Sequence, residues 1–216
     1  MNNKPRVLVL YSGGRDSSAT ALEMARSGYD VTLFTYSDGT PELTGRNGDS
    51  APEIRHQELM LAYPDVIREE RVKRGNVYLL KKLALEKTNS THVVYPLVLI
   101  LNVVADAILY CLQNNISHIA CGYSGYKGRE ERYVEQNQQF YDLMKQFIAE
   151  YNIEYVAPIL NSSKEEVVHI LEKHGVSTNS LENRSPFSGI PFEKDKALAF
   201  WEESLPICRE YIAYRK

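Results

Sequence analysis

The chain has 216 residues, of which 44% are hydrophobic and 25% are charged, and its formal net charge is −3. A chain of this length and composition fits one soluble α/β domain with a small C-terminal appendage. The acidic balance disfavours a general polyanion-binding surface, so we expect no nucleic acid among its partners.

The apolar segments and the cysteines indicate in which cellular compartment the protein is expected. No signal peptide precedes the first apolar run. The longest apolar stretch, residues 93–111, is interrupted by a proline, an asparagine and an aspartate, so it predicts a buried helix and no membrane span. The cysteines Cys111, Cys121 and Cys208 form neither a CxxC pair nor a cluster with histidine, which predicts no zinc site. We therefore expect a cytoplasmic protein with reduced thiols.

In chain order, short apolar runs alternate with segments of helical periodicity. Residues 6–11 and 31–36 are almost wholly apolar, as in parallel strands that are covered on both faces. Further strands are predicted at residues 66–67, 117–121 and 154–157, and helices at 16–27, 53–63, 77–87, 97–114, 133–151 and 163–174. The alternation predicts an α/β, Rossmann-like fold, a parallel five-stranded sheet with helices on both faces. It assigns residues 1–180 to this domain and residues 181–216 to a short C-terminal helical extension packed on it.

The segment between the first strand and the first helix reads Ser12-Gly13-Gly14-Arg15-Asp16-Ser17-Ser18. A polyanion placed there meets backbone N–H groups at the positive end of a helix dipole. The glycines permit a sharp turn and leave no side chain in front of a phosphate, while the serines add hydroxyl donors. Asp16 can cap the helix or hold Mg²⁺. The pattern is neither GxxxxGK[ST] nor GxGxxG, and its alternative interpretation is a plain strand-to-helix turn with a serine-rich cap.

The segment SGGRDS resembles the SGGxDS signature of the PP-loop ATP pyrophosphatases. Those enzymes adenylate a carbonyl oxygen and release pyrophosphate, after which a nitrogen or sulfur nucleophile displaces AMP. The resemblance implies an adenine nucleotide alpha hydrolase fold, with ATP and Mg²⁺ as cofactors. It implies that ATP is bound by the loop, by the end of the second strand, which lines the adenine pocket, and by the residue after the fourth strand: Ser12, Gly13, Gly14, Asp16, Ser17, Ser18, Phe34, Thr35, Tyr36 and Gly122.

Beyond the loop, residues 6–184 resemble the 7-cyano-7-deazaguanine synthase branch. Residues 133–140 keep the spacing of that branch's Tyr-x-Asp-x-Arg-x-x-Phe pattern, with Glu135 and Asn137 in place of its acidic and basic residues. Pro158 followed by Lys164-Glu165-Glu166 matches the branch's proline and Lys-x-Glu helix start. This match implies that Lys164 contacts phosphate or AMP and takes part in catalysis.

Two features depart from that branch. The synthases carry zinc-ligating cysteines near the C-terminus, whereas residues 181–192 contain none, so no zinc is expected. The synthases also keep an arginine near the start of the long helix, where this chain has residues 95–98, Tyr-Pro-Leu-Val. These departures favour a different reaction on a related, purine-like substrate.

Cysteine at a strand end suggests which reaction this is. Cys121 closes the predicted fourth strand, and ligands of open parallel sheets bind outside the carboxyl ends of the strands. A thiolate there, with its pKa lowered by neighbouring cations, could attack the adenylated carbon or carry a persulfide; the alternative is a buried core thiol. Cys111 is a second candidate, weighed against core packing.

Sulfur-inserting members of the superfamily replace a carbonyl oxygen of a nucleobase with sulfur. This resemblance favours thioamide formation of the 6-thioguanine type, with a cysteine desulfurase as the sulfur donor. Nitrogen insertion, as in the 7-cyano-7-deazaguanine synthases, is the alternative within the same chemistry. A nucleotide-binding module without catalysis is the alternative from another class, and transfer RNA modification is disfavoured because the chain is short and acidic.

The remaining predictions concern the substrate and the assembly. Residues 124–132 are rich in charge and glycine, so they form either a lid over the adenylate or a solvated loop. His56 is either a phosphate contact or part of a solvated helix face. The long apolar helix and the aromatic C-terminal segment favour a homodimer. The residues predicted to contact a purine-like substrate are Tyr123, Tyr126, Arg129, Glu135 and Arg184.

Overall fold

The computed structural model describes residues 4–37, 50–87, 95–124, 137–179 and 193–216. Its centre is a five-stranded sheet with the order β3-β2-β1-β4-β5, in which every pair of neighbours is parallel. The strands are β1 Arg6–Leu10, β2 Asp30–Tyr36, β3 Val72–Arg74, β4 His118–Ala120 and β5 Glu154–Val156. The helices are α1 Arg15–Arg26, α2 Ala51–Ala62, α3 Val77–Lys87, α4 Tyr95–Asn114, α5 Gln138–Ala149, α6 Lys164–Lys173 and α7 Lys194–Arg215.

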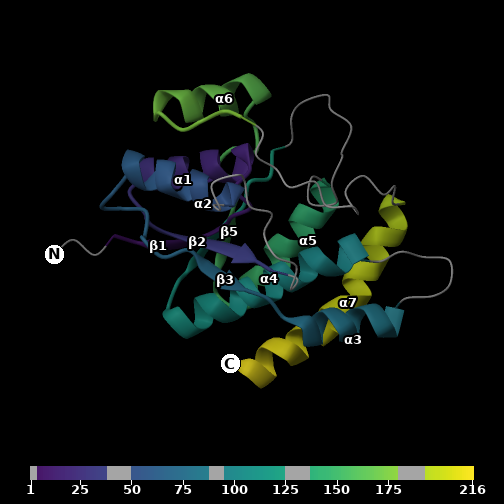
Figure 1. Cartoon of the computed structure of the whole chain (residues 1–216). Coiled ribbons are helices and arrows are strands. Elements are labelled where there is room, and N and C mark those ends of the chain that lie inside the picture. The colour runs from purple at the N-terminus through teal and green to yellow at the C-terminus, as the bar shows by residue number, and fades with distance from the viewer. Residues whose placement is uncertain (1–3, 38–49, 88–94, 125–136, 180–192) are drawn as a thin grey trace.

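Helices cover both faces of the sheet, with α1, α2 and α6 on one side and α3, α4, α5 and α7 on the other (Figure 1). Side chains of β1 alternate between these layers. Val7 and Val9 belong to the core beneath α1, whereas Leu8 belongs to the core beneath α4. A strand covered on both faces needs apolar residues at every position, which is why the sequence of β1 reads as a continuous apolar run.

Helix α4 is long and apolar enough to cross a membrane by length and composition alone, with a mean hydropathy of 1.7 over Leu97–Asn114. In the structure, 61% of that window is buried inside the protein. Nine of its residues belong to the buried core on that side of the sheet. The prediction of a buried helix is therefore confirmed, and α4 is a core helix.

Helix α7 lies in the same layer as α4 and shares its core. The indole Nε1 of Trp201 donates a hydrogen bond to the carbonyl oxygen of Leu97 at 3.3 Å, and its ring lies 4.4 Å from that of Phe140. The aromatic residues of the C-terminal segment thus close the apolar face of α4.

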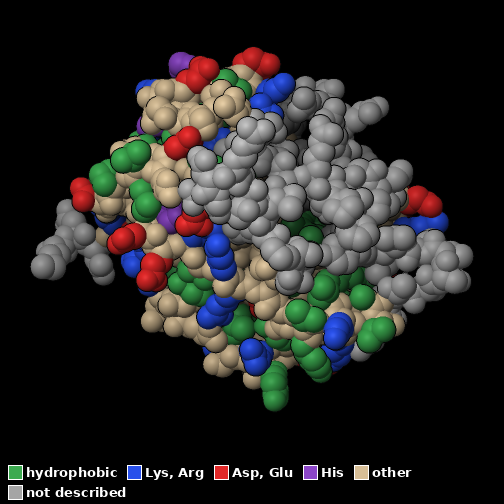
Figure 2. Space-filling view, in the orientation of Figure 1, with side chains coloured by type: hydrophobic (Ala, Val, Ile, Leu, Met, Phe, Trp, Pro, Cys, Tyr) green, Lys and Arg blue, Asp and Glu red, His purple; other side chains and the backbone are tan. Residues whose placement is uncertain are grey.

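The outer surface of α3 and α7 keeps several large apolar side chains exposed, and Figure 2 shows hydrophobic and basic side chains gathered over this part of the molecule. Tyr78 and Leu85 on α3 are 72% and 80% exposed, and Tyr214 on α7 is 88% exposed. This surface, Tyr78, Leu85 and Tyr214, is named the α3/α7 apolar surface below.

Two predicted elements differ from the structure. The third strand was expected at residues 66–67, but Ile67 forms only an isolated bridge with Val31, and β3 follows at Val72–Arg74. The chain passes β2 twice because the polar residues between Ile67 and Val72 interrupt the ladder. Helix α5 begins at Gln138, because the Asn137 side chain caps it by accepting a hydrogen bond from the Phe140 N–H at 3.1 Å, and the first four residues of the predicted helix, 133–136, lie outside the described residues.

Candidate nucleotide site

The loop between β1 and α1 has a backbone that only glycine accommodates. Gly13 has a φ of +78°, in the left-handed region, and a Cβ added there would lie 2.6 Å from the Cα of Pro52 at the start of α2. Gly14, in extended conformation, precedes the first residue of α1. The chain therefore turns sharply and places the N-terminus of α1 directly after β1, where backbone N–H groups can bind an anion.

The serine hydroxyls of the loop divide into two roles. Ser18 is fully buried, and its hydroxyl donates to the carbonyl oxygen of Gly14 at 2.8 Å, so it stabilises the helix start. The hydroxyls of Ser12 and Ser17 lie 3.2 Å apart, and the Gly14 N–H donates to Ser12 Oγ at 3.3 Å. Ser12 is exposed. All three hydroxyls thus make contacts within the loop, and Ser12 is the exposed residue among them.

The end of β4 packs directly on this loop. A Cβ added to Gly122 would lie 2.9 Å from the backbone nitrogen of Ser17 and 3.0 Å from the carbonyl carbon of Asp16. Two residues later, the Ser124 hydroxyl donates to Asp16 Oδ2 at 3.3 Å. The structure therefore brings Gly122 against the loop that contains Ser12, Gly13, Asp16 and Ser17, although more than 100 residues separate Gly122 from that loop in the sequence.

The three residues predicted to line the adenine pocket lie in different environments. Phe34 is buried, and its ring packs 6.0 Å from that of Tyr110 on α4, so it belongs to the core. The Thr35 hydroxyl donates to the carbonyl oxygen of Tyr11 at 2.9 Å. Tyr36 is only partly buried at the carboxyl end of β2, and its hydroxyl accepts a hydrogen bond from the Asn76 N–H at 3.3 Å.

Two arginines with buried side chains lie behind the loop, and neither is among the site residues predicted from the sequence. Arg71 donates to Thr35 Oγ1 and to Glu53 Oε2, each at 2.9 Å. The bond from Arg71 is the main reason why the pKa of Glu53 falls below its usual range. This arginine thus ties the end of β2 to α2, the helix that begins against Gly13.

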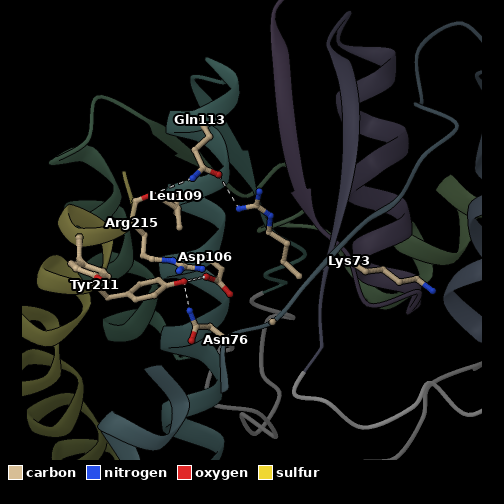
Figure 3. Close-up of a pocket in the computed structure, with 10 residues that line it drawn as sticks. Lys73, Asn76, Asp106, Leu109, Gln113, Tyr211 and Arg215 are labelled. Atoms are coloured by element: carbon tan, nitrogen blue, oxygen red, sulfur yellow. Dashed lines mark hydrogen bonds between the residues drawn. The ribbon is translucent and has the colours of Figure 1, made fainter. Parts of the chain in front are cut away.

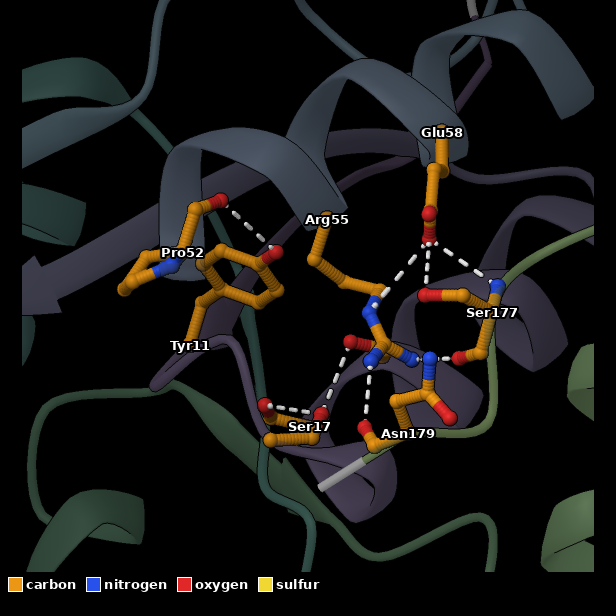
Figure 4. A network of polar contacts seen from close by, with 9 residues as sticks. Tyr11, Ser17, Pro52, Arg55, Glu58, Ser177 and Asn179 are labelled. Atoms are coloured by element: carbon orange, nitrogen blue, oxygen red, sulfur yellow. Dashed lines mark hydrogen bonds and ion pairs between the residues drawn. The ribbon is translucent and has the colours of Figure 1, made fainter. Parts of the chain in front are cut away.

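Arg55 on α2 is fully buried and makes the second connection. Its guanidinium donates to the carbonyl oxygens of Ser177 and Asn179 and forms an ion pair with Glu58 at 3.4 Å (Figure 4). Glu58 in turn accepts hydrogen bonds from the N–H and the hydroxyl of Ser177, each at 3.0 Å. Burial lowers the pKa of Arg55, and the partner Glu58 opposes that shift. The cluster fixes the segment after α6 against α2.

The only sequence signal for these arginines was the pairing of Arg55 and Glu58 at i and i+3 in one predicted helix. His56, weighed above as a phosphate contact, is buried, and its Nε2 lies 2.9 Å from the carbonyl oxygen of Arg68. Arg55 and His56 of α2 therefore make hydrogen bonds inside the protein.

The cysteines proposed for sulfur chemistry are buried free thiols. Cys121 is 6% exposed, and burial raises the pKa of its thiol to about 11. Burial likewise raises the pKa of Cys111 to about 12. Near Cys121 the rings of Tyr123, Tyr141 and Tyr155 stack at centroid distances of 5.2 and 5.3 Å. The sulfur mechanism requires a thiolate with a lowered pKa at the strand end. This environment instead raises the pKa of Cys121.

The other predicted site residues are placed as follows. Lys164 is exposed at the first position of α6, a helix that packs on α1 and starts with a capping box between Ser163 and Glu166. Tyr123 is buried in the aromatic stack. Tyr126, Arg129, Glu135 and Arg184 lie outside the described residues. Within the described ranges, three or more His, Cys, Asp or Glu residues nowhere gather in a way that could hold a metal ion.

The sequence model of one protein family, described as "Queuosine biosynthesis protein QueC", matches residues 6–184. The chain belongs to the QueC family. It is a PP-loop ATP pyrophosphatase. A search of curated proteins finds no match.

Solved structures show the same fold at low identity. A 4-thiouridine synthetase in complex with RNA and bound ATP superimposes with a TM-score of 0.63 at 14% identity, covering 96% of this chain. The QueC-family chain corresponds to 53% of that protein's length. The NMN synthetase from Francisella tularensis superimposes with a TM-score of 0.51 at 12% identity, covering 98% of this chain and 86% of that one. The expected adenine nucleotide alpha hydrolase fold is therefore confirmed.

Proposed function

We propose that the chain uses ATP to insert nitrogen into a carboxylate of a 7-deazaguanine-type base, giving first an amide and then a nitrile. Two observations support nitrogen over the sulfur chemistry favoured by the sequence. The chain belongs to the QueC family. The thiols of Cys121 and Cys111 are buried, and their pKa values are raised to about 11 and about 12, which leaves them protonated at neutral pH.

The proposed reaction balances in two rounds. A carboxylate oxygen attacks the α-phosphorus of ATP, pyrophosphate leaves, and ammonia then adds to the carbonyl carbon, expelling AMP and a proton to give the amide. The amide oxygen attacks the α-phosphorus of a second ATP and a second pyrophosphate leaves, after which loss of AMP and of the two nitrogen-bound protons gives the nitrile. A carboxylate oxygen is a poor leaving group, so its transfer to AMP is what makes each displacement feasible.

The residues of the loop have defined tasks in these steps. The N-terminus of α1, reached through Gly13 and Gly14, offers backbone N–H groups to the β- and γ-phosphates. The exposed hydroxyl of Ser12 adds a donor at the open side of the loop. Mg²⁺ would neutralise phosphate charge when bound, and Asp16, whose Oδ2 accepts a hydrogen bond from the Ser124 hydroxyl, is the residue proposed to hold it. Lys164, exposed where α6 begins, is proposed to contact AMP.

The observation that carries this proposal is the glycine loop itself, with its positive-φ Gly13 closed by Pro52 and by the end of β4. The test is pyrophosphate release with 7-carboxy-7-deazaguanine and either ammonium or sulfide, with the product mass determined in parallel. We expect two pyrophosphates per nitrile with ammonium and none without a nucleophile beyond the first turnover. Pyrophosphate release that depends on sulfide and gives a thioamide would overturn the nitrogen assignment.

A cysteine series separates the two nucleophiles further. Cys121→Ser and Cys111→Ser should leave ammonium-dependent pyrophosphate release unchanged, because neither thiol takes part in that reaction. Cys208→Ser, a third buried thiol on α7 far along the chain, is the matched control for the effect of removing a buried sulfur. Loss of turnover in Cys121→Ser alone would restore a covalent role for that thiol.

A further inference from the structure

A cavity that opens to solvent lies beside the edge strand of the sheet. It has a volume of about 650 Å³ and is lined by residues of β3, of the second half of α4 and of the end of α7 (Figure 3). A volume of this size is within the range of small-molecule sites, roughly 300–1,000 Å³. The side chain of Lys73 points away from it, towards Glu53 at 3.7 Å, so β3 separates this cavity from the helix that closes the phosphate loop.

The cavity wall contains a buried carboxyl group with an oxygen that has no partner. Asp106 on α4 is 3% exposed, and its Oδ1 accepts a hydrogen bond from the Tyr211 hydroxyl at 2.7 Å. Within the described part of the chain, Asp106 Oδ2 is buried and has no hydrogen-bond partner. A buried polar atom without a partner is uncommon and costs free energy, so a ligand that brought a hydrogen-bond donor to this oxygen would remove that cost.

Two guanidinium groups share the cavity with this carboxyl. Arg74 is held by Gln113 Oε1 at 3.1 Å and by the ring of Tyr110, 5.0 Å from its centroid. Arg215 comes from the last turn of α7. Both guanidiniums lower the pKa of Asp106, but burial outweighs them and raises it overall. Guanidinium groups recognise phosphate and carboxylate groups.

We propose that this cavity binds a purine nucleoside monophosphate, with its phosphate on Arg215 and Arg74 and an N–H donor of its base on Asp106 Oδ2. The volume exceeds what a bare anion needs, and the rings of Tyr211 and Tyr214 line it. Neither half of such a ligand satisfies the site alone, because inorganic phosphate brings no base donor and a nucleoside brings no anion.

The cavity is connected to the adenine end of the nucleotide site by direct hydrogen bonds. The Asn76 side-chain amide donates to the Tyr211 hydroxyl, and the Asn76 N–H donates to the Tyr36 hydroxyl at 3.3 Å. The Ser37 N–H also donates to the carbonyl oxygen of Arg74 at 2.7 Å. A nucleotide in the cavity therefore contacts residues bonded to the end of β2, so its binding and that of ATP should be coupled, equally in both directions.

The test measures AMP binding to the full chain by calorimetry while a saturating nonhydrolysable ATP analogue occupies the phosphate loop. We expect one further equivalent of AMP to bind, and Arg215→Gln and Asp106→Asn each to weaken it about tenfold or more, the loss expected when one charged hydrogen bond is removed. Lys216→Gln removes the same charge from the neighbouring residue, which does not line the cavity, and should bind AMP as the parent chain does.

Each outcome decides the proposal. No AMP uptake with the loop occupied overturns it, as does uptake that Arg215→Gln and Asp106→Asn leave unchanged. Inorganic phosphate that competes as tightly as AMP reduces the cavity to an anion site and overturns the nucleotide assignment. Arg215 is exposed at the end of α7, so Arg215→Gln should fold normally, and thermal melting checks both variants. Pyrophosphate release by Arg215→Gln is measured separately, which keeps a failure here distinct from a failure of the proposed reaction.

Discussion

Replacing Gly13 with alanine perturbs the phosphate loop at the point where its backbone has no tolerance. The residue has a φ of +78°, and the new Cβ would lie 2.6 Å from Pro52 Cα and 2.8 Å from Pro52 N. Both contacts are with backbone atoms of the residue that opens α2, so no side-chain rotation relieves them. Either the loop or the start of α2 must move.

The magnitude follows from two contributions. Placing an L-residue in the left-handed region costs roughly 1–2 kcal/mol. Forcing an extra methyl group into a packed site adds about 1–3 kcal/mol. Together they lower the free energy of unfolding by about 2–5 kcal/mol, which for a chain of this size lowers Tm by roughly 4–20 °C. ATP binding should be lost as well, because the N–H groups of the loop no longer converge on the phosphates.

Gly28→Ala is the matched control at the other end of α1. Gly28 has a φ of +89°, so it carries the same backbone cost, but a Cβ there meets no atom within 4 Å. It should lower Tm by only about 2–8 °C and should bind ATP normally. The assay is thermal melting with and without ATP, since a ligand that binds only the folded protein raises its Tm.

The reasoning is refuted if Gly13→Ala and Gly28→Ala lose the same stability, because the contact with Pro52 would then contribute nothing. It is equally refuted if Gly13→Ala keeps the full stabilisation by ATP, since the phosphates would then be held elsewhere.

Three further results are expected. Arg55→Gln should lower the free energy of unfolding by about 3 kcal/mol in urea denaturation, because it leaves Glu58 and two backbone carbonyls without their buried cation; an unchanged midpoint would contradict this. Burial raises the pKa of the Cys121 thiol to about 11, so it should react with iodoacetamide at pH 7 at least about tenfold more slowly in the native than in the unfolded protein. Equal rates would show an exposed thiolate. If two copies associate through the α3/α7 apolar surface, Leu85→Glu should convert the dimer to a monomer in sedimentation. Leu61→Glu changes a similarly exposed leucine on α2 and should leave the dimer intact. A parent chain that is monomeric would refute the homodimer.

The sequence predicted those parts of the fold whose signal is local. Strands β1 and β2 are buried on both faces, so their apolar runs indicate parallel strands inside the protein. Strand β3 is short and lies at the edge of the sheet, with Lys73 exposed, so its sequence carries no apolar run to detect. The apolar pair at residues 66–67 resembles a strand instead, because Ile67 is buried against the sheet. Ile67 forms only an isolated bridge there and does not extend the ladder.

In the candidate site, too, only the residues with a local sequence signal can be predicted. Gly13, Gly14 and Ser17 can be proposed from the sequence because phosphate binding needs those residue types close together in the chain. Arg55 and Arg71 were not, because their partners at Ser177 and Thr35 lie 122 and 36 residues away. The environment of Cys121 was also beyond the sequence, since position at a strand end does not reveal that Tyr123, Tyr141 and Tyr155 enclose the thiol.

Transfer of an oxygen atom from substrate to AMP tests the central claim most directly. With 7-carboxy-7-deazaguanine labelled with ¹⁸O in its carboxylate, adenylation at the carboxylate oxygen predicts that the AMP released carries one ¹⁸O atom and the pyrophosphate none. AMP without label, or label found in inorganic phosphate together with ADP, would contradict the account.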